Sequence, residues 1–390
     1  MPVRPVAGRG ALTITLHGLR QDQEALFRNI LRSQTGGTDL ASAPPSFSVH
    51  GPDRGSRKLV LAGTVRQLDN AALLLTKSEL VPDLAEKIRS VLDNYLRTDY
   101  KINCRGKILD LAGRTQVMGI LNVTPDSFSD GGRYADPERA LVHARAMVAA
   151  GADIIDIGGE STRPGAEPVP EEEELRRIIP LIERLSAELA IPLSVDTYKA
   201  PVAKKALEAG ASIVNDISGL RFSPDMGEVV AQYGAALIIM HIKGTPRDMQ
   251  QNPVYADLIG EVLSYLEEGI GMAEQAGVDR ERIMIDPGIG FGKTLEHNLT
   301  ILNRLDEFRV LGRPVVLGTS RKKFIGTVLG ITRPDERLEG TAATVALGIE
   351  RGASVVRVHD VGPLARVARM TDAIVKQSTK SQALNTNKHQ

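Results

Sequence analysis

The sequence predicts an α/β fold, a (β/α)8 TIM barrel preceded by a small N-terminal α/β domain. From about residue 116 onward, short β-branched runs alternate with longer segments of helical character. Such apolar runs are typical of strands that are buried on both faces. A glycine recurs where a helical segment passes into the next run, as in GADI, GASI, GAAL and GASV. Glycine there ends a helix in the left-handed conformation, so the chain repeats a βα unit.

The N-terminal part of the chain follows a different pattern. Within residues 1–100, the segment ALTITLHGLRQDQEALFRNILRSQ predicts a strand followed by a helix. The segment RKLVLAGTVRQLDNAALLLTKSE repeats that order. The segment VPDLAEKIRSVLDNYLRT predicts a further helix, and the polar stretch 36–57 separates the first two units. No cluster of residues suited to chemistry occurs there, so we expect a structural or oligomeric role.

The remaining residues divide into three predicted parts. Residues 101–115 are expected to form a hairpin that closes the bottom of the barrel, residues 116–376 the barrel and residues 377–390 a frayed polar tail. The predicted barrel strands are QVMGILN, DIIDIGG, LSVDT, SIVNDI, ALIIMHI, RIMIDPG, PVVLGTS and SVVRVHD. The alternative is an open doubly wound sheet, which usually carries a glycine-rich phosphate-binding turn after its first strand. Here NVTPDS follows the first strand, which favours the barrel.

Composition excludes several classes of partner. The 48 basic residues equal the 48 acidic residues, so no basic surface for nucleic acid is expected. No apolar run approaches the roughly 18 residues of a membrane span, and the N-terminus lacks the apolar stretch of a signal peptide. The single cysteine, Cys104, cannot form an internal disulfide, which suits a reducing cytoplasm.

Polar residues fall at the ends of the predicted strands. In a (β/α)8 barrel these ends meet at one rim, where the active site lies. Polar groups at nearly every strand end are hard to explain by packing, because buried polar atoms need partners. Asp216 and His241, taken singly, fit a structural role equally well. The whole set is Asn122, Asp156, Asp196, Asn215, Asp216, His241, Asp286, Ser320, Arg321, Lys322, Arg357 and His359.

The central strands offer hydrogen-bond acceptors and an amide. Asp196, Asn215 and Asp286 suit a flat heterocycle that is rich in N–H donors, such as the edge of a pterin or a purine. A carboxylate can accept two parallel N–H bonds from an amino-pyrimidinone ring. These three residues therefore predict a heterocycle site.

The first and last strands predict an anion site. Arg357 and His359 stand two residues apart on one strand and so share a face. Asn122 ends the strand that lies next to them once the barrel closes. Because arginine binds phosphate through two parallel hydrogen bonds, the ligand is expected to carry a phosphate or diphosphate.

Two long loops follow the first two barrel strands. NVTPDSFSDGGRY and ESTRPGAEPVP exceed the usual length of about two to six residues for a βα loop, so lids are favoured over plain connectors. The segment DPGIGFGKT does not satisfy the spacing of a P-loop, because Pro287 stands where a glycine is needed. Its glycines are expected to let the backbone approach a flat ligand.

These segments together resemble the dihydropteroate synthase family. MGILNVTPDSFSDGG and DIIDIGGESTRPGAEPV are similar to its two signature segments. SVDTYKAPVAKKALEAGASIVNDISGL, MHIKGTP, DPGIGFGKTLEHNL, LGTSRKKFIG and RVHDV follow in the family's order, so the resemblance covers about residues 103–375. It implies a transferase that joins p-aminobenzoate to 7,8-dihydropterin-6-ylmethyl diphosphate, releasing diphosphate and forming 7,8-dihydropteroate for folate synthesis. It also implies Mg²⁺, a homodimer formed through barrel helices, and competition by sulfonamides for the p-aminobenzoate pocket.

The resemblance also implies roles for individual positions. The pterin would be held by Asp196, Asn215, Asp286 and Lys322. The diphosphate would be held by Asn122, Thr162, Arg357 and His359, with Mg²⁺ at Asn122. The lids and the p-aminobenzoate pocket would contain Phe128, Thr162, Arg163, Pro164, Ser320 and Lys322. The expected catalytic residues are Asp126, Asp196, Asp286, Lys322 and Arg357.

An SN1-like mechanism agrees with this set. Departure of diphosphate leaves a cation that is delocalised into the pterin, which Asp196, Asp286 and Asp126 would stabilise electrostatically. An aniline nitrogen is already neutral, so its attack requires no strong base. The lids would exclude water, which would otherwise capture the cation.

Two other functions share part of this set. A methyltransferase that passes a methyl group from tetrahydrofolate to a corrinoid protein would use the same pterin contacts. It would need neither a diphosphate site nor the ESTRPG loop. A non-catalytic pterin-binding paralogue would be expected to lack lid or anion residues, and the sequence lacks none of them.

Overall fold

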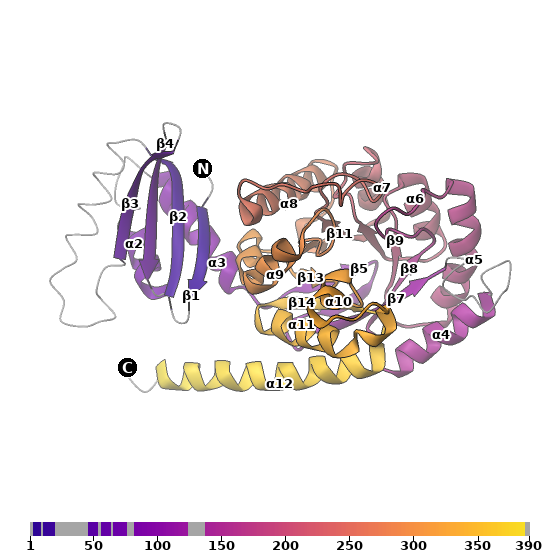
Figure 1. The fold of residues 1–390 in the computed structure, drawn as a ribbon. Coiled ribbons are helices and arrows are strands. Elements are labelled where there is room, and N and C mark those ends of the chain that lie inside the picture. Colours follow the sequence, from indigo (N-terminus) through magenta and orange to yellow (C-terminus); the bar gives the residue numbers. More distant parts are fainter. Residues whose placement is uncertain are drawn as a thin grey trace. The chain divides into compact units, whose positions relative to one another are not determined.

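The chain folds into two compact units (Figure 1). The computed structural model describes residues 3–8, 11–19, 46–53, 56–63, 65–75, 82–123 and 137–386. The first unit comprises Met1–Arg97 and Asp306–Gly312, and the second comprises Thr98–Leu305 and Arg313–Gln390.

The first unit contains a four-stranded antiparallel sheet in the order β1-β2-β4-β3. Its elements are β1 (Val3–Gly8), β2 (Ala11–Leu19), β3 (Ser46–Asp53), β4 (Ser56–Gly63), α2 (Val65–Leu75) and α3 (Pro82–Leu96). The sequence predicted β2, β4, α2 and α3 but missed β1, and the helix predicted after β2 lies outside the described residues. The stretch 36–57 was expected to be a polar separator, and this is wrong for β3. The residues of β3 pair with those of β4 in an antiparallel ladder. Pairing of the two backbones stabilises β3 as a strand although its sequence is polar.

The second unit is a closed barrel of parallel strands in the order β7 to β14 (Figure 1). The predicted (β/α)8 fold is confirmed. The strands are β7 (Gln116–Asn122), β8 (Ile154–Gly158), β9 (Leu193–Asp196), β10 (Ile213–Asp216), β11 (Ala236–Met240), β12 (Ile283–Asp286), β13 (Val315–Leu317) and β14 (Ala353–Val358). The helices are α4 (Pro137–Ala149), α5 (Glu171–Glu188), α6 (Ala200–Glu208), α7 (Met226–Tyr233), α8 (Leu258–Gln275), α9 (Leu295–Asn303), α10 (Lys323–Leu329), α11 (Leu338–Glu350) and α12 (Val361–Thr386). Short 3-10 turns occur at Arg280–Arg282, Leu305–Leu311 and Pro334–Glu336.

Glycines end the helices at the joints where the sequence predicted them. Gly151, Gly210, Gly234, Gly277 and Gly352 have φ angles of 105°, 114°, 57°, 91° and 94°. These angles lie in the region that residues with a Cβ adopt rarely. Each glycine therefore lets the chain leave a helix and enter the next strand within a short turn.

A hairpin of β5 (Lys101–Cys104) and β6 (Lys107–Asp110) closes the bottom of the barrel. Its apolar side chains join one buried cluster with residues from seven of the barrel strands. Arg105 donates through Nη1 to Ala211 O at 2.7 Å, just before β10 begins. The hairpin thus fills the end where the strands start, and the rim where they finish is left for ligands.

Helix α12 corrects the prediction of a frayed tail from residue 377. The helix runs to Thr386 without interruption. The segment KQSTKSQALNT contains neither glycine nor proline, so nothing in the local sequence ends the helix earlier. Within the described part of the chain, no helix is both long and apolar enough to cross a membrane.

Candidate active site

Arg357 joins two groups of residues that the sequence suggested were separate. Arg357 Nε on β14 donates to Asp156 Oδ2 on β8, and its Nη2 donates to Asp196 Oδ2 on β9, each at 2.6 Å. Asn215 Nδ2 on β10 donates to the same Asp156 oxygen at 3.2 Å. Arg357, predicted for the anion, therefore also contacts Asp196, which was predicted for the heterocycle, so the two predicted groups adjoin each other. In the closed barrel only β7 separates β14 from β8, so one guanidinium reaches the carboxylates.

Asp156 is the centre of this network; it was predicted to lie at the rim, but no individual role was predicted for it. It lies two residues before Gly158, which ends β8, and therefore shares the face that points into the barrel. This alternation is the signal that could have identified it. Oδ1 of Asp156 and Oδ1 of Asp196 are buried and have no hydrogen-bond partner within the described structure. Two unpaired carboxylate oxygens are unfavourable unless a ligand donates to them, so they fit a heterocycle with N–H donors.

Asp286 is the last residue of β12, and Lys322 ends the loop between β13 and α10. Asp286 Oδ1 accepts a hydrogen bond from Gly288 N at 2.7 Å. Lys322 Nζ donates to Ile289 O and lies 4.7 Å from the centre of the Phe291 ring. No role was predicted for Phe291, which here also packs against an apolar cluster that includes Met240 and Ile242. The cation, the carboxylate and the ring together can enclose a flat polar ligand.

Burial shifts the pKa values of this cluster toward neutrality. Burial raises the pKa of Asp196 to about 7, although Arg357 favours the ionised form. The pKa of Asp286 is also raised by burial. Burial lowers the pKa of Lys322 to about 8, against the opposing effect of Asp286. Perturbed ionisable groups that share a rim are typical of functional sites.

His359 is held as a neutral imidazole. Its Nδ1 lies 2.9 Å from Ser320 Oγ, and its backbone N–H donates to the same oxygen at 3.1 Å. Burial, reinforced by the charge of Arg357, lowers the pKa of His359 to about 3. Ser320 was predicted to line the p-aminobenzoate pocket, and in this structure it orients the imidazole. The loop after β13 is also linked to the loop after β14 by an ion pair between Arg321 and Asp360, with Nη2 2.5 Å from Oδ1.

Thr162, Arg163 and Pro164 lie on the loop between β8 and α5. Arg163 and Pro164 are exposed, and Thr162 is half-buried. The charge of Arg163 contributes to the lowered pKa of His359, which indicates that the loop lies near this part of the rim. Arg163 therefore lies within electrostatic range of His359.

Asn122 ends β7 directly beside Gly158 of β8. A Cβ on Gly158 would lie 3.7 Å from Asn122 Oδ1, so the amide lies close to the interior of the rim. Asp126 and Phe128 lie outside the described residues. Their expected roles therefore stay predictions.

Asp216 and His241 have structural partners. Asp216 Oδ1 accepts from Ser218 N at 2.8 Å, and its Oδ2 accepts from Leu220 N at 2.7 Å, which closes the turn after β10. His241 Nδ1 pairs with the buried Lys293 Nζ at 2.8 Å. The structural interpretation of both residues is supported by these contacts.

The glycines of DPGIGFGKT are required by packing against the loop after β11. A Cβ at Gly288 would lie 1.8 Å from His241 O, and one at Gly292 would lie 2.5 Å from Lys243 O. Packing therefore accounts for both glycines, and their expected approach to a ligand stays a prediction. The backbone of a neighbouring loop occupies the space that a side chain would need.

The residues present fit a magnesium ion only together with a ligand. No group of three or more His, Cys, Asp and Glu residues that could hold a metal occurs in the described ranges. Asn122 offers one neutral oxygen. Mg²⁺ is commonly bound by one or two protein oxygens together with substrate phosphates and waters. The site thus suits an ion that arrives with a diphosphate.

Comparison with known proteins places this geometry in a family. The pterin binding enzyme family matches residues 118–359, which is more than half of the chain. The dihydropteroate synthase of Bacillus subtilis strain 168 is 52% identical over 276 residues, which is 71% of this chain and 94% of that protein. A structure of Xanthomonas albilineans dihydropteroate synthase with 4-aminobenzoic acid has a TM-score of 0.67 at 46% identity and covers 71% of this chain and 98% of its own.

A second solved structure agrees with the first. Yersinia pestis dihydropteroate synthase in a sulfonamide complex has a TM-score of 0.67 at 42% identity and covers 70% of this chain and 98% of its own. Both structures and the curated relative carry the same activity in their names. The chain therefore belongs to the dihydropteroate synthases, the pterin-binding transferases of folate biosynthesis.

Proposed function

We propose that the rim catalyses an SN1-like transfer of the dihydropterin-6-ylmethyl group from its diphosphate to p-aminobenzoate. The observation that supports it most is the bridge from Arg357 to Asp156 and Asp196, which leaves one buried oxygen of each carboxylate without a partner. Those oxygens can accept N–H bonds from the amino-pyrimidinone edge of a pterin. Asn215, Asp286 and Lys322 complete the proposed pterin site.

The first chemical step is cleavage of the bond between the methylene carbon and the diphosphate oxygen. The electron pair leaves with the diphosphate, and the cation that remains is delocalised into the pterin ring. The carboxylates of Asp196 and Asp286 lie at the same rim and stabilise this positive charge; we propose that Asp126 adds to the effect. Arg357, His359, Asn122 and Thr162 receive the diphosphate. Mg²⁺ held at Asn122 would supply further neutralisation of the leaving group.

The second step is attack by the amine of p-aminobenzoate. Its nitrogen lone pair forms the new C–N bond, and the proton that the amine then loses passes to the released diphosphate or to water. We assign the p-aminobenzoate pocket to Lys322, Ser320 and the loop residues Arg163, Pro164 and Phe128. Relatives have been solved with 4-aminobenzoic acid and with a sulfonamide, which supports binding of this class of ligand, and we expect sulfonamides to compete with p-aminobenzoate.

The activity is tested by following release of diphosphate. The full chain is supplied with the pterin diphosphate, p-aminobenzoate and Mg²⁺, and each component is omitted in turn. We expect release that depends on both organic substrates and falls when Mg²⁺ is chelated. Release that does not depend on p-aminobenzoate would exclude the proposed transfer.

Pterin affinity is expected to rise with pH through neutrality. The N–H donors of the ring favour the ionised form of Asp196, whose pKa burial raises to about 7 in the free enzyme. Binding therefore releases a proton, so affinity increases between about pH 6 and pH 8 and levels above that. Calorimetry in buffers of different ionisation enthalpy measures both effects. Asp196→Asn is the control and should lose the part of the rise that is centred near pH 7, while any contribution of Lys322, whose pKa is about 8, remains. A wild-type affinity that is constant with pH would contradict the assignment.

We propose a cytoplasmic homodimer as the working state. A single cysteine, buried as Cys104, is compatible with a reducing compartment. Light scattering of the purified full chain tests the dimer, and a mass equal to one 42.0 kDa chain at micromolar concentration would exclude it.

A further inference from the structure

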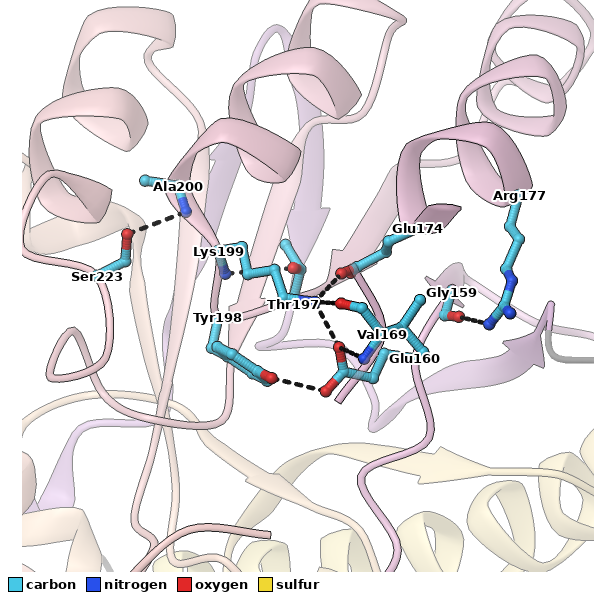
Figure 2. Close-up of polar contacts among 10 residues, drawn as sticks. All are labelled: Gly159, Glu160, Val169, Glu174, Arg177, Thr197, Tyr198, Lys199, Ala200 and Ser223. Carbon is cyan, nitrogen blue, oxygen red and sulfur yellow. Dashed lines mark hydrogen bonds and ion pairs between the residues drawn. The ribbon is translucent and has the colours of Figure 1, made fainter. Parts of the chain in front are cut away.

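Lys199 holds together both ends of the loop that carries Thr162 and Arg163. It stands between β9 and α6, outside that loop. Its Nζ donates to Glu160 at the start of the loop and to Val169 O at its end, the latter at 2.7 Å. Figure 2 shows these contacts converging on one ammonium group.

Glu160 and Glu174 complete this arrangement, which we call the loop clamp: Glu160, Val169, Glu174, Tyr198 and Lys199. Glu160 Oε2 also accepts from Val169 N at 3.1 Å, and its Oε1 accepts from the Tyr198 hydroxyl at 2.6 Å (Figure 2). The third donor of Lys199 goes to Glu174 Oε2 at 2.6 Å, in the first turn of α5. A lysine has three N–H donors, and here each has a partner.

The loop clamp is buried, which makes its charges consequential. The side chains of Lys199, Glu160 and Glu174 are 13%, 7% and 1% exposed. Exposed ion pairs contribute little to a structure, whereas removing one member of a buried pair leaves an uncompensated charge. The clamp therefore constrains the loop base far more than a surface ion pair would.

The position of the clamp connects it to the active site. Tyr198 and Lys199 follow Asp196 by two and three residues, so the clamp ties the loop to the strand end that carries a proposed pterin ligand. The residues between Glu160 and Val169 are exposed or half-buried, and among them the Gly165 amide donates to Pro246 O at 3.1 Å. The clamp thus fixes where the loop begins and ends while its middle stays accessible.

We propose that Lys199 and Glu160 are positioning residues that set the loop 161–168 over the rim for p-aminobenzoate, without contacting the pterin themselves. The inference rests on the proposed function of that loop. A shift of the loop moves the groups that are proposed to hold p-aminobenzoate, so it weakens the binding of this substrate and raises its KM. The pterin contacts belong to the strand ends and do not depend on the loop.

Lys199→Met tests the proposal because it keeps the length of the side chain and removes the ammonium group. We expect the KM for p-aminobenzoate to rise about tenfold and the Kd for the pterin to change by less than about twofold. Hydrogen exchange should accelerate at the Val169 and Gly165 amides and stay unchanged in the barrel strands. Lys205→Met is the matched control, since Lys205 lies on α6 in an exposed pair with Glu208 and should leave all three readouts unchanged.

Tyr198→Phe provides a second variant if Lys199→Met does not fold. It removes only the hydroxyl that holds Glu160 Oε1, and we expect the KM for p-aminobenzoate to rise about threefold with pterin affinity preserved. An unchanged KM for p-aminobenzoate in a folded variant, or an equal loss of pterin affinity, would overturn the proposal. If the wild-type chain released no diphosphate, the proposed function would fail. The role of the clamp would then be decided by hydrogen exchange and pterin affinity in Lys199→Met. Faster exchange at the amides of residues 161–169 with unchanged pterin affinity would support it, and unchanged exchange would overturn it.

Discussion

Replacing Arg357 by lysine is expected to lower kcat/KM by about a hundredfold although the positive charge is kept. Arg357 donates from two different nitrogens to Asp156 and Asp196, each at 2.6 Å. A lysine ammonium carries its donors on one atom and does not reproduce this fork. The loss of one charged hydrogen bond is worth about 2–3 kcal/mol, which corresponds to roughly this factor in rate. Steady-state release of diphosphate measures it.

Arg145→Lys is the control for the chemistry of the substitution. Arg145 pairs with Glu188 on the surface, where the two side chains are 48% and 38% exposed, so kcat/KM should not change. Thermal unfolding of both variants separates a loss of the site from a loss of the fold. Wild-type kinetics in a folded Arg357→Lys enzyme would remove the guanidinium from the proposed mechanism.

Asp196→Asn is expected to weaken pterin binding by about 2 kcal/mol or more, which is about thirtyfold in Kd. The substitution keeps the shape of the side chain and removes its charge. It also replaces one acceptor oxygen by an NH₂ group. This group is a donor, so it cannot accept a hydrogen bond from Arg357 or from the N–H groups of a pterin. Calorimetric titration with a pterin that lacks the diphosphate isolates this part of the site.

Asp225→Asn is the matched control, because Asp225 is exposed at the start of α7. It should bind the pterin as the wild-type chain does. An Asp196→Asn variant with unchanged pterin affinity would show that Oδ1 of Asp196, which has no partner in the free site, is not a ligand acceptor.

The barrel and its rim residues could be predicted from the sequence because both depend on local patterns. Strand periodicity and a recurring glycine at the joints from helix to strand indicate a repeated βα unit, and the end of a strand indicates the rim. Asp196, Asn215 and Asp286 were therefore placed correctly at the ends of β9, β10 and β12. The antiparallel pairing of the N-terminal sheet was not predictable in this way. The sequence of β3 is polar, and β3 is a strand because it pairs with β4.

The partners of the site residues were decided by the tertiary structure alone. Arg357 and Asp156 are 201 residues apart in the sequence, and they meet because the last strand of the barrel closes onto the first. The same closure makes Asp156 the centre of the site, although no local pattern distinguishes it from Asp216. Lys199 likewise meets Glu160 and Val169 only because β9 lies next to β8. A sequence specifies which residues reach the rim through local alternation, whereas hydrogen-bond partners depend on distances that exist only after the barrel has closed.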